Sequence, residues 1–133
     1  MKETTKAWIK FAKSDFKVKD LIFDDDEMEL IFSFHCQQTI EKLFKAILVE
    51  NDILPPKIHD LQRLFYLLPE DIKSQLSSCE SELEILSVIY IDSRYPSDYT
   101  LLPNAFISKE DLIKINESTN NLYNTLLTLL TKN

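Results

Sequence analysis

The sequence contains no glycine among its 133 residues. Glycine supplies the positive backbone φ that β-hairpin turns and helix-to-strand turns often need. It also lets the backbone approach a phosphate closely in glycine-rich nucleotide loops. Its absence therefore excludes the P-loop, the dinucleotide-binding fingerprint and the nucleophile elbow of hydrolases. A bundle of helices joined by turns of Pro, Asn and Asp is the simplest remaining architecture.

Cysteine and long apolar runs are also scarce. Cys36 and Cys79 are the only cysteines and form no Cys-x-x-Cys pair, so we expect two reduced core thiols. No apolar run is long enough to span a bilayer, and the first residues lack the apolar segment of a signal peptide. These features predict a cytoplasmic protein without a membrane partner.

Positive charge is in deficit as well. Fifteen Lys and Arg stand against 22 Asp and Glu, which gives a net charge of −7. Such a chain repels a polyanion on average, so there is no strong nucleic-acid signal. Apolar residues make up 44% of the chain, which is enough for a core, and the length predicts a single domain over residues 1–133.

Apolar residues recur at steps of three and four along most of the chain, which is the spacing of amphipathic helices. The pattern predicts four long helices, over about 4–22, 27–50 and 70–92 and from Ser108 onward, and a short helix over about 59–67. The fold class is therefore all-α: an up-and-down four-helix bundle with an additional short helix between the second and third long helices. The first helix is expected to bury Trp8, Phe11, Ala12, Phe16, Lys19 and Ile22.

The second predicted helix has two different faces. Its apolar side gathers Cys36, Ile40, Leu43, Phe44 and Ile47. Its polar side aligns a ladder of hydrogen-bond donors that suits a phosphate or a partner's carboxylate, namely His35, Gln38, Lys42 and Lys45.

These polar residues also allow structural roles. His35 could hydrogen-bond at a helix interface instead of binding phosphate, and the two lysines could form an exposed face with Glu41 as counter-charge. Arg94, beside Tyr95, could bind a phosphate or carboxylate in bidentate fashion, or cap the carbonyls of its own helix. His59 is expected to be a cap or an anchor of the short helix. No spacing typical of metal ligands is present, so we expect neither a metal nor a cofactor.

Three local signatures occur in order along the chain, preceded by Trp8 and Ala12. They are Phe34-His35-Cys36-Gln37-Gln38 with Glu41, Lys42, Lys45 and Ala46, then His59-Asp60-Leu61, then Ser93-Arg94-Tyr95-Pro96. With them the chain resembles a HEPN domain (higher eukaryotes and prokaryotes nucleotide-binding) over about residues 8–130. The resemblance implies a helical bundle, usually dimeric, with a polar cleft near the second helix and the loop after the third. Members include helical partners of small nucleotidyltransferases and metal-independent ribonucleases, which are often toxins of toxin–antitoxin pairs.

The ribonuclease branch carries an Arg followed by four to six residues and then a His. Arg94 aligns with that Arg, but Tyr99, Thr100 and Leu101 occupy the candidate histidine positions. The general acid/base of RNA cleavage is therefore missing at its usual place, which places the chain in the non-ribonuclease branch.

We therefore predict a non-catalytic HEPN-like domain that binds a nucleotide or other anionic ligand. It would act as a homodimer and as a partner or substrate-binding subunit of a small nucleotidyltransferase. Two alternatives stay open: a toxin-type ribonuclease with a displaced catalytic residue, which would pair His35 with Arg94 across a dimer cleft, and a plain dimerising interaction module. The predicted ligand-binding residues are His35, Gln38, Lys42, Lys45, Arg94 and Tyr95.

Overall fold

The computed structural model describes residues 1–94 and 107–132, and for residues 88–94 it describes the backbone alone. The described residues contain helices and no strand, so the all-α prediction is confirmed. The elements in chain order are α1 (Glu3–Ile22), α2 (Glu29–Glu50), α3 (Leu61–Tyr66), α4 (Glu70–Gln75), the 3₁₀ helix η1 (Ser77–Cys79), α5 (Glu80–Arg94) and α6 (Lys109–Thr131).

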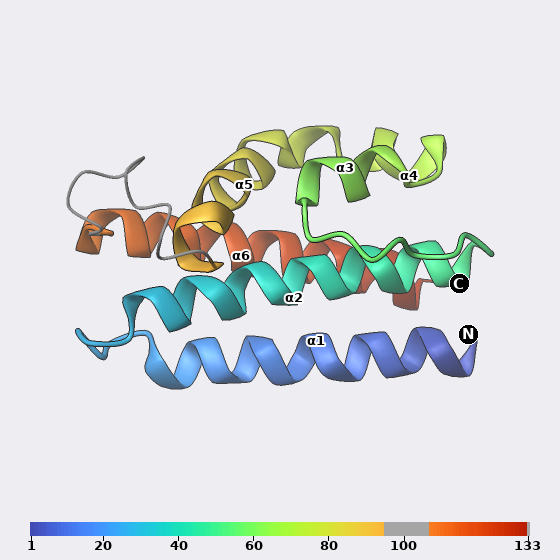
Figure 1. Cartoon of the computed structure of the whole chain (residues 1–133). Helices are drawn as coiled ribbons and strands as arrows, with labels where there is room; N and C mark the ends of the chain where they lie inside the picture. Colours follow the sequence, from blue (N-terminus) through green and yellow to red (C-terminus); the bar gives the residue numbers. More distant parts are fainter. Residues whose placement is uncertain (95–106, 133) are drawn as a thin grey trace.

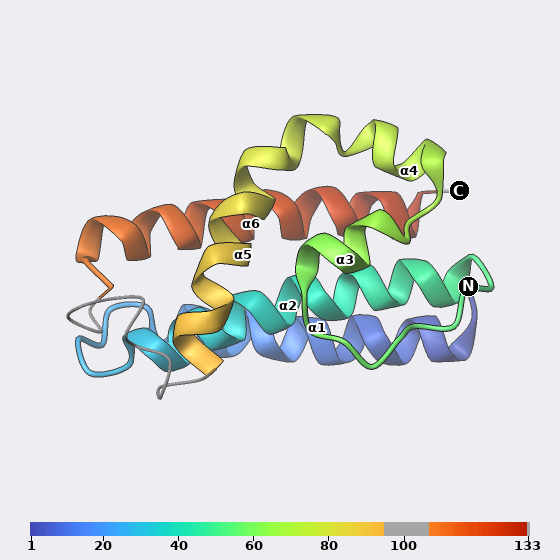
Figure 2. The same cartoon turned by 45° about the horizontal axis from the view of Figure 1, so that its top comes forward.

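Helix α2 is the centre of the bundle. It packs against α1, α5 and α6, and the four long helices alternate in direction (Figures 1 and 2). Both ends of the described chain lie at the same end of the bundle (Figure 1). This arrangement confirms the predicted helical bundle. Between its second and third long helices lie α3, α4 and η1, where one short helix was predicted. None of the described helices has the length and apolar character that crossing a membrane requires.

The core forms along the apolar side of α2 as predicted. Cys36, Ile40, Leu43, Phe44 and Ile47 are each at most 1% exposed. Full burial of one large apolar side chain contributes about 1.5–3 kcal/mol, so this face supplies much of the stability of the bundle. The other long helices meet it with Ile9 and Ala12 of α1, Leu83 and Leu86 of α5, and Ile115, Leu122 and Leu126 of α6.

The third long helix differs from its prediction, because the span 70–92 is divided into α4, η1 and α5. The division falls at Leu76 and the serines that follow it. Serine hydroxyls compete for backbone hydrogen bonds and so weaken a helix interior. Leu76 and Cys79 are both buried at this point, so the change of direction between α4 and α5 (Figure 2) lets both elements bury apolar side chains.

The first helix also differs from its prediction. Ala12 and Lys19 are buried as expected, but Trp8, Phe16 and Ile22 are only half-buried. Phe11 was expected in the core but is 57% exposed, whereas Ile9 is buried in its place. The buried side of α1 is unusually polar, since Thr5, Asp15 and Lys19 are all enclosed. The core stripe of α1 is therefore rotated away from Phe11 toward these polar residues, because their hydrogen-bond partners lie on α2 and α6.

Candidate functional site

Asp15 of α1 contacts two of the predicted hydrogen-bond donors of α2. Its Oδ1 atom lies 2.8 Å from Nδ1 of His35, and its Oδ2 atom accepts a hydrogen bond from Nζ of Lys42 at 2.5 Å. The carboxylate is 10% exposed, and the His35 and Lys42 side chains are 23% and 24% exposed. These three residues, the Asp15 cluster, thus form a polar site that solvent still reaches.

Glu41 of α2 contacts the other two predicted hydrogen-bond donors. It accepts hydrogen bonds from Nε2 of Gln38 and from Nζ of Lys45, each at 3.1 Å. Nδ1 of His59 lies 3.1 Å from the same carboxylate. The Glu41 and Lys45 side chains are only 4% and 8% exposed, and the Lys45 ammonium group lies 5.6 Å from the centre of the Trp8 ring. These residues, the Glu41 cluster, form a network that is enclosed except at His59, whose side chain is 42% exposed.

The spacing of these residues along α2 explains the two clusters. Gln38, Glu41 and Lys45 are separated by three and four positions, so their side chains are neighbours on one side of the helix. His35 and Lys42 are seven positions apart, which is close to two helical turns, and Asp15 lies between them. The four predicted donors therefore do lie along α2 as a ladder, but each of them is paired with a carboxylate of the same chain.

Asp15 was missed at the sequence level, although one signal was available. It follows the buried Ala12 by three positions and precedes the buried Lys19 by four, so it continues the core side of α1. A carboxylate on a buried helix face needs charged or hydrogen-bonding partners. The two donors that meet it lie 20 and 27 residues further along the chain.

Lys19 forms a third buried polar contact, between α1 and α6. Its side chain is fully buried, and Nζ donates to the side-chain oxygens of Asp20, Asn116 and Asn120 at 2.6, 2.9 and 2.7 Å. Beside it the Phe16 ring stacks on Tyr123 with centroids 3.7 Å apart. These contacts join α1 to α6.

Cys36 is a buried thiol, as predicted. Burial raises its pKa to about 12, and the hydrogen bond with Thr119 opposes part of that shift. The thiol is therefore protonated and unreactive at neutral pH. Within the described residues, no three His, Cys, Asp or Glu side chains are grouped so that they could hold a metal ion.

Arg94 is the last residue of α5, and Tyr95 lies outside the described residues. Helix α5 contacts α2 where Nε2 of Gln37 donates to the Leu86 carbonyl at 3.4 Å. Arg94 follows Leu86 by eight residues, about 12 Å along a helix. Figures 1 and 2 both show this end of α5 beside the N-terminal half of α2, the half that carries His35. The backbone thus brings Arg94 to the His35 end of α2.

These features define a helical domain whose central helix carries a partly exposed polar cluster on the side that faces α1. The family model described as "HEPN domain" matches residues 5–129. The chain therefore belongs to the HEPN domain family, a family of nucleotide-binding and ribonuclease-type helical domains. No curated protein and no solved structure matches the chain significantly.

Proposed function

We propose that this chain is a non-catalytic HEPN domain that binds a nucleotide or another anionic ligand as the partner of a small nucleotidyltransferase, and that it forms a homodimer. The observation that carries the proposal is the Asp15 cluster. Its two donors from α2, His35 and Lys42, are more exposed than Gln38 and Lys45, and His35 lies in the half of α2 beside which α5 ends at Arg94 (Figure 1).

The charges of the cluster suit a weakly held anion. Asp15 offsets the charge of Lys42, so the cluster is neutral when His35 is neutral and carries one positive charge when His35 is protonated. Arg94 would add a guanidinium group that can bind two phosphate oxygens at once. In this proposal His35, Lys42, Arg94 and Tyr95 contact the ligand.

Gln38 and Lys45 have a different role in the proposal. They are 7% and 6% exposed, and both donate to Glu41. A ligand that reached them would have to break those hydrogen bonds, and an unpaired Glu41 carboxylate would then remain buried. We therefore assign them to positioning α2, with the ligand held at the His35 end.

The non-catalytic part of the proposal rests on the sequence after Arg94. Tyr99, Thr100 and Leu101 stand where the ribonuclease branch of the family carries histidine after the arginine that aligns with Arg94. A tyrosine is a poor general base near neutral pH because its ordinary pKa is about 10.

Isothermal titration with ATP tests the binding site. We expect Lys42→Gln and Arg94→Gln each to weaken binding about fivefold or more, because each removes a positive charge from the anion site. Asp15→Asn should tighten binding, because it removes the carboxylate that competes with phosphate for Lys42. Lys109→Gln, at an exposed position of α6, is the matched control. Absence of binding at millimolar ATP would reject the nucleotide proposal, and native mass spectrometry at micromolar protein checks the homodimer.

One observation favours a second candidate, a ribonuclease with a displaced catalytic histidine. The contact between Asp15 and Nδ1 of His35 can fix the imidazole and leave Nε2 to accept a proton, as general bases require. An RNA cleavage assay separates the candidates. Cleavage that His35→Gln abolishes and His59→Gln retains would support this one, and intact RNA at high protein concentration would reject it.

A further inference from the structure

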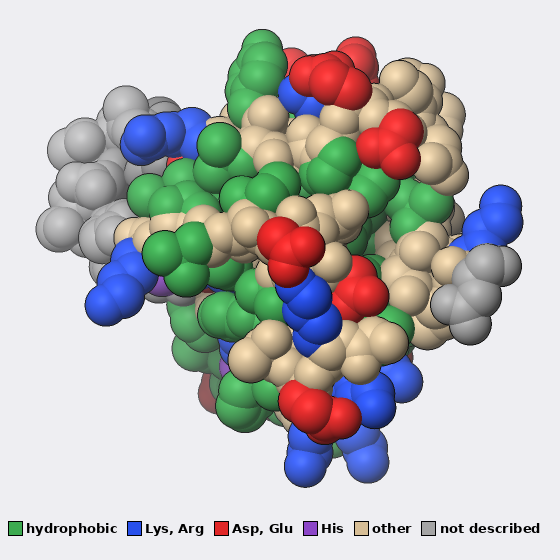
Figure 3. Space-filling model, turned by 90° about the vertical axis from the view of Figure 1, so that its right-hand side faces the viewer, with side chains coloured by type: hydrophobic (Ala, Val, Ile, Leu, Met, Phe, Trp, Pro, Cys, Tyr) green, Lys and Arg blue, Asp and Glu red, His purple; other side chains and the backbone are tan. Residues whose placement is uncertain are grey.

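Four lysines of α1 form a continuous strip on one side of the helix. Their spacing of four, three and four positions confines them to about 60° of arc at 100° per residue. The strip lies on the side of α1 opposite Asp15, so it is separate from the Asp15 cluster. Figure 3 shows Lys and Arg side chains gathered along the lower edge of the molecule, where α1 lies. The lysine strip consists of Lys6, Lys10, Lys13 and Lys17, all exposed.

The strip is not neutralised in the part of the chain that the structure describes. Its single ion pair there joins Lys6 to Glu3 at 3.3 Å, with both side chains exposed, and such a pair is weak. By contrast, Lys19, Lys42 and Lys45 are each held by a carboxylate. A row of four exposed lysines with one weak ion pair, on a protein of net charge −7, is a local positive field that would attract an acidic partner.

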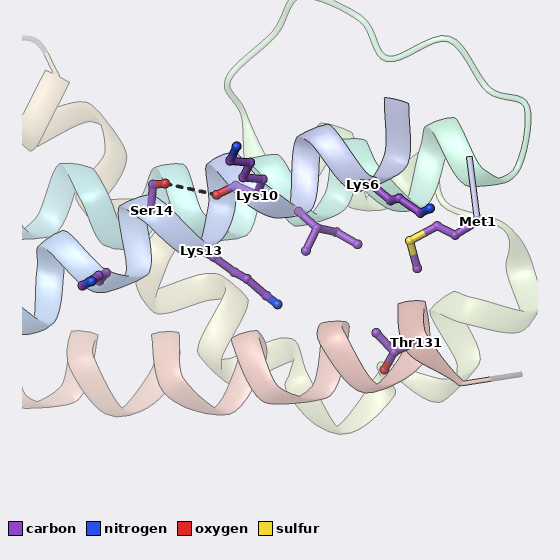
Figure 4. Close-up of a pocket in the computed structure, with 8 residues that line it drawn as sticks. Met1, Lys6, Lys10, Lys13, Ser14 and Thr131 are labelled. Atoms are coloured by element: carbon purple, nitrogen blue, oxygen red, sulfur yellow. Dashed lines mark hydrogen bonds between the residues drawn. The ribbon is translucent and has the colours of Figure 1, made fainter. Parts of the chain in front are cut away.

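The strip borders a groove between α1 and α6. The groove has a volume of about 530 Å³ and is lined by the lysine strip together with Met1, Ile9, Ser14 and Thr131. Figure 4 shows Lys13 extending from α1 into the space above α6, with Met1 and Thr131 at the other end of that space. The groove thus combines an apolar floor with a basic rim.

We propose that this groove binds an acidic amphipathic helix of a protein partner. The lysines rise by about 6, 4.5 and 6 Å along α1, so a helix lying beside α1 would match them with acids at positions i, i+4, i+7 and i+11. Its apolar residues would then enter the groove, as in other helix-in-groove complexes. The acidic turn Asp24–Glu27 of a second copy does not fit, because four consecutive acids in a turn lack this spacing.

The groove favours an acidic helix over a nucleic acid. Its lining contains neither the aromatic rings that stack on bases nor an arginine that could bind a phosphate in bidentate fashion. The negative charge of the rest of the molecule also opposes a long polyanion. A short acidic helix needs no aromatic stacking partner, and it is not a long polyanion that the rest of the molecule would repel.

A designed peptide tests the groove directly. The probe is a fluorescein-labelled helix of about 18 residues, ~27 Å long, with Glu at i, i+4, i+7 and i+11 and Leu on the adjoining face. A peptide of identical composition with its Glu residues scattered around the helix is the matched control. We expect the ordered peptide to bind about tenfold more tightly or better, and more weakly at about 0.3 M salt than at about 0.05 M.

Two protein variants complete the experiment. Lys6→Gln/Lys10→Gln/Lys13→Gln/Lys17→Gln should weaken binding about tenfold or more, the loss expected for four partly exposed ion pairs. A second quadruple variant carries the same change in net charge on other exposed lysines and should bind within about threefold of the unaltered chain. Equal binding by the two variants, equal binding of the two peptides, or preference for a single-stranded RNA over the ordered peptide would overturn the proposal. The control positions are Lys57, Lys109, Lys114 and Lys132.

Discussion

The buried pair of Glu41 and Lys45 provides the sharpest test of how the bundle is held together. At the observed separation of 3.1 Å, the attraction between two unit charges is about 5 kcal/mol at an effective dielectric constant of 20. Desolvation opposes this gain. The free energy of unfolding should therefore respond far more to the loss of one partner than to the loss of both.

We expect Glu41→Leu to lower the free energy of unfolding by about 3–5 kcal/mol, because Lys45 then remains as a buried charge with no carboxylate. Lys45→Met should cost about 2–4 kcal/mol, since Gln38 and His59 still contact the Glu41 carboxylate. The double variant should cost only about 1–2 kcal/mol, mainly from the Gln38 amide that loses its acceptor.

Urea unfolding followed by helical circular dichroism measures these values. With a denaturant dependence of about 2 kcal/mol per molar, Glu41→Leu should move the midpoint by about 2 M. The same exchanges at the exposed pair, Glu3→Leu and Lys6→Met, should each change stability by less than about 1 kcal/mol. A double variant whose loss equals the sum of the two single losses would refute the reasoning, because the pair would then be uncoupled.

Three further predictions follow from other contacts. Because burial raises the pKa of Cys36 to about 12, iodoacetamide at about pH 8 should label Cys36 only as fast as the chain unfolds. Mass spectrometry measures the labelling, and rapid labelling of the folded protein would contradict this prediction. The hydrogen bond from the Lys2 backbone N–H, and to a smaller extent that from the Thr5 hydroxyl, lowers the pKa of Glu50 below its ordinary value of 4.5. The stability that Glu50 contributes is therefore present above pH 4.5 and is lost as the pH falls through the lower pKa of the folded state. Glu50→Gln should therefore flatten the pH dependence of the urea midpoint below pH 4.5, and an unchanged slope would argue against it. Asp60→Ala should cost about 1 kcal/mol, because the Asp60 side chain accepts the first backbone N–H bonds of α3, and a melting temperature equal to that of the unaltered chain would be the contrary result.

The helices were predictable because their signal is local. The periodicity of apolar residues placed both ends of α1 and α2, and the start of α6, within a few residues of their observed bounds. The capping residue Ser108 marked the start of α6, and its hydroxyl accepts the Asp111 N–H at 3.0 Å. The division of the third helix was missed because leucines continue at helical spacing across it, and only packing decides that the chain turns at Leu76.

The polar site was predictable only in part. Sequence spacing put His35, Gln38, Lys42 and Lys45 on the polar side of α2, but it could not show where their hydrogen bonds go. Gln38 and Lys45 meet Glu41 within one helix, a contact that spacing alone allows. His35 and Lys42 instead meet Asp15, which another helix supplies.

The sequence by itself determined the all-helical bundle, the apolar side of α2 and membership of a family whose motifs it carries. These depend on periodicity and on short segments, which involve few residues at a time. Only the tertiary structure decided that Asp15 pairs with two donors of α2 and that Lys19 meets Asn116 and Asn120, 97 and 101 positions away. Such pairs depend on how helices rotate and cross when they bury their apolar sides, and one helix alone does not specify that geometry.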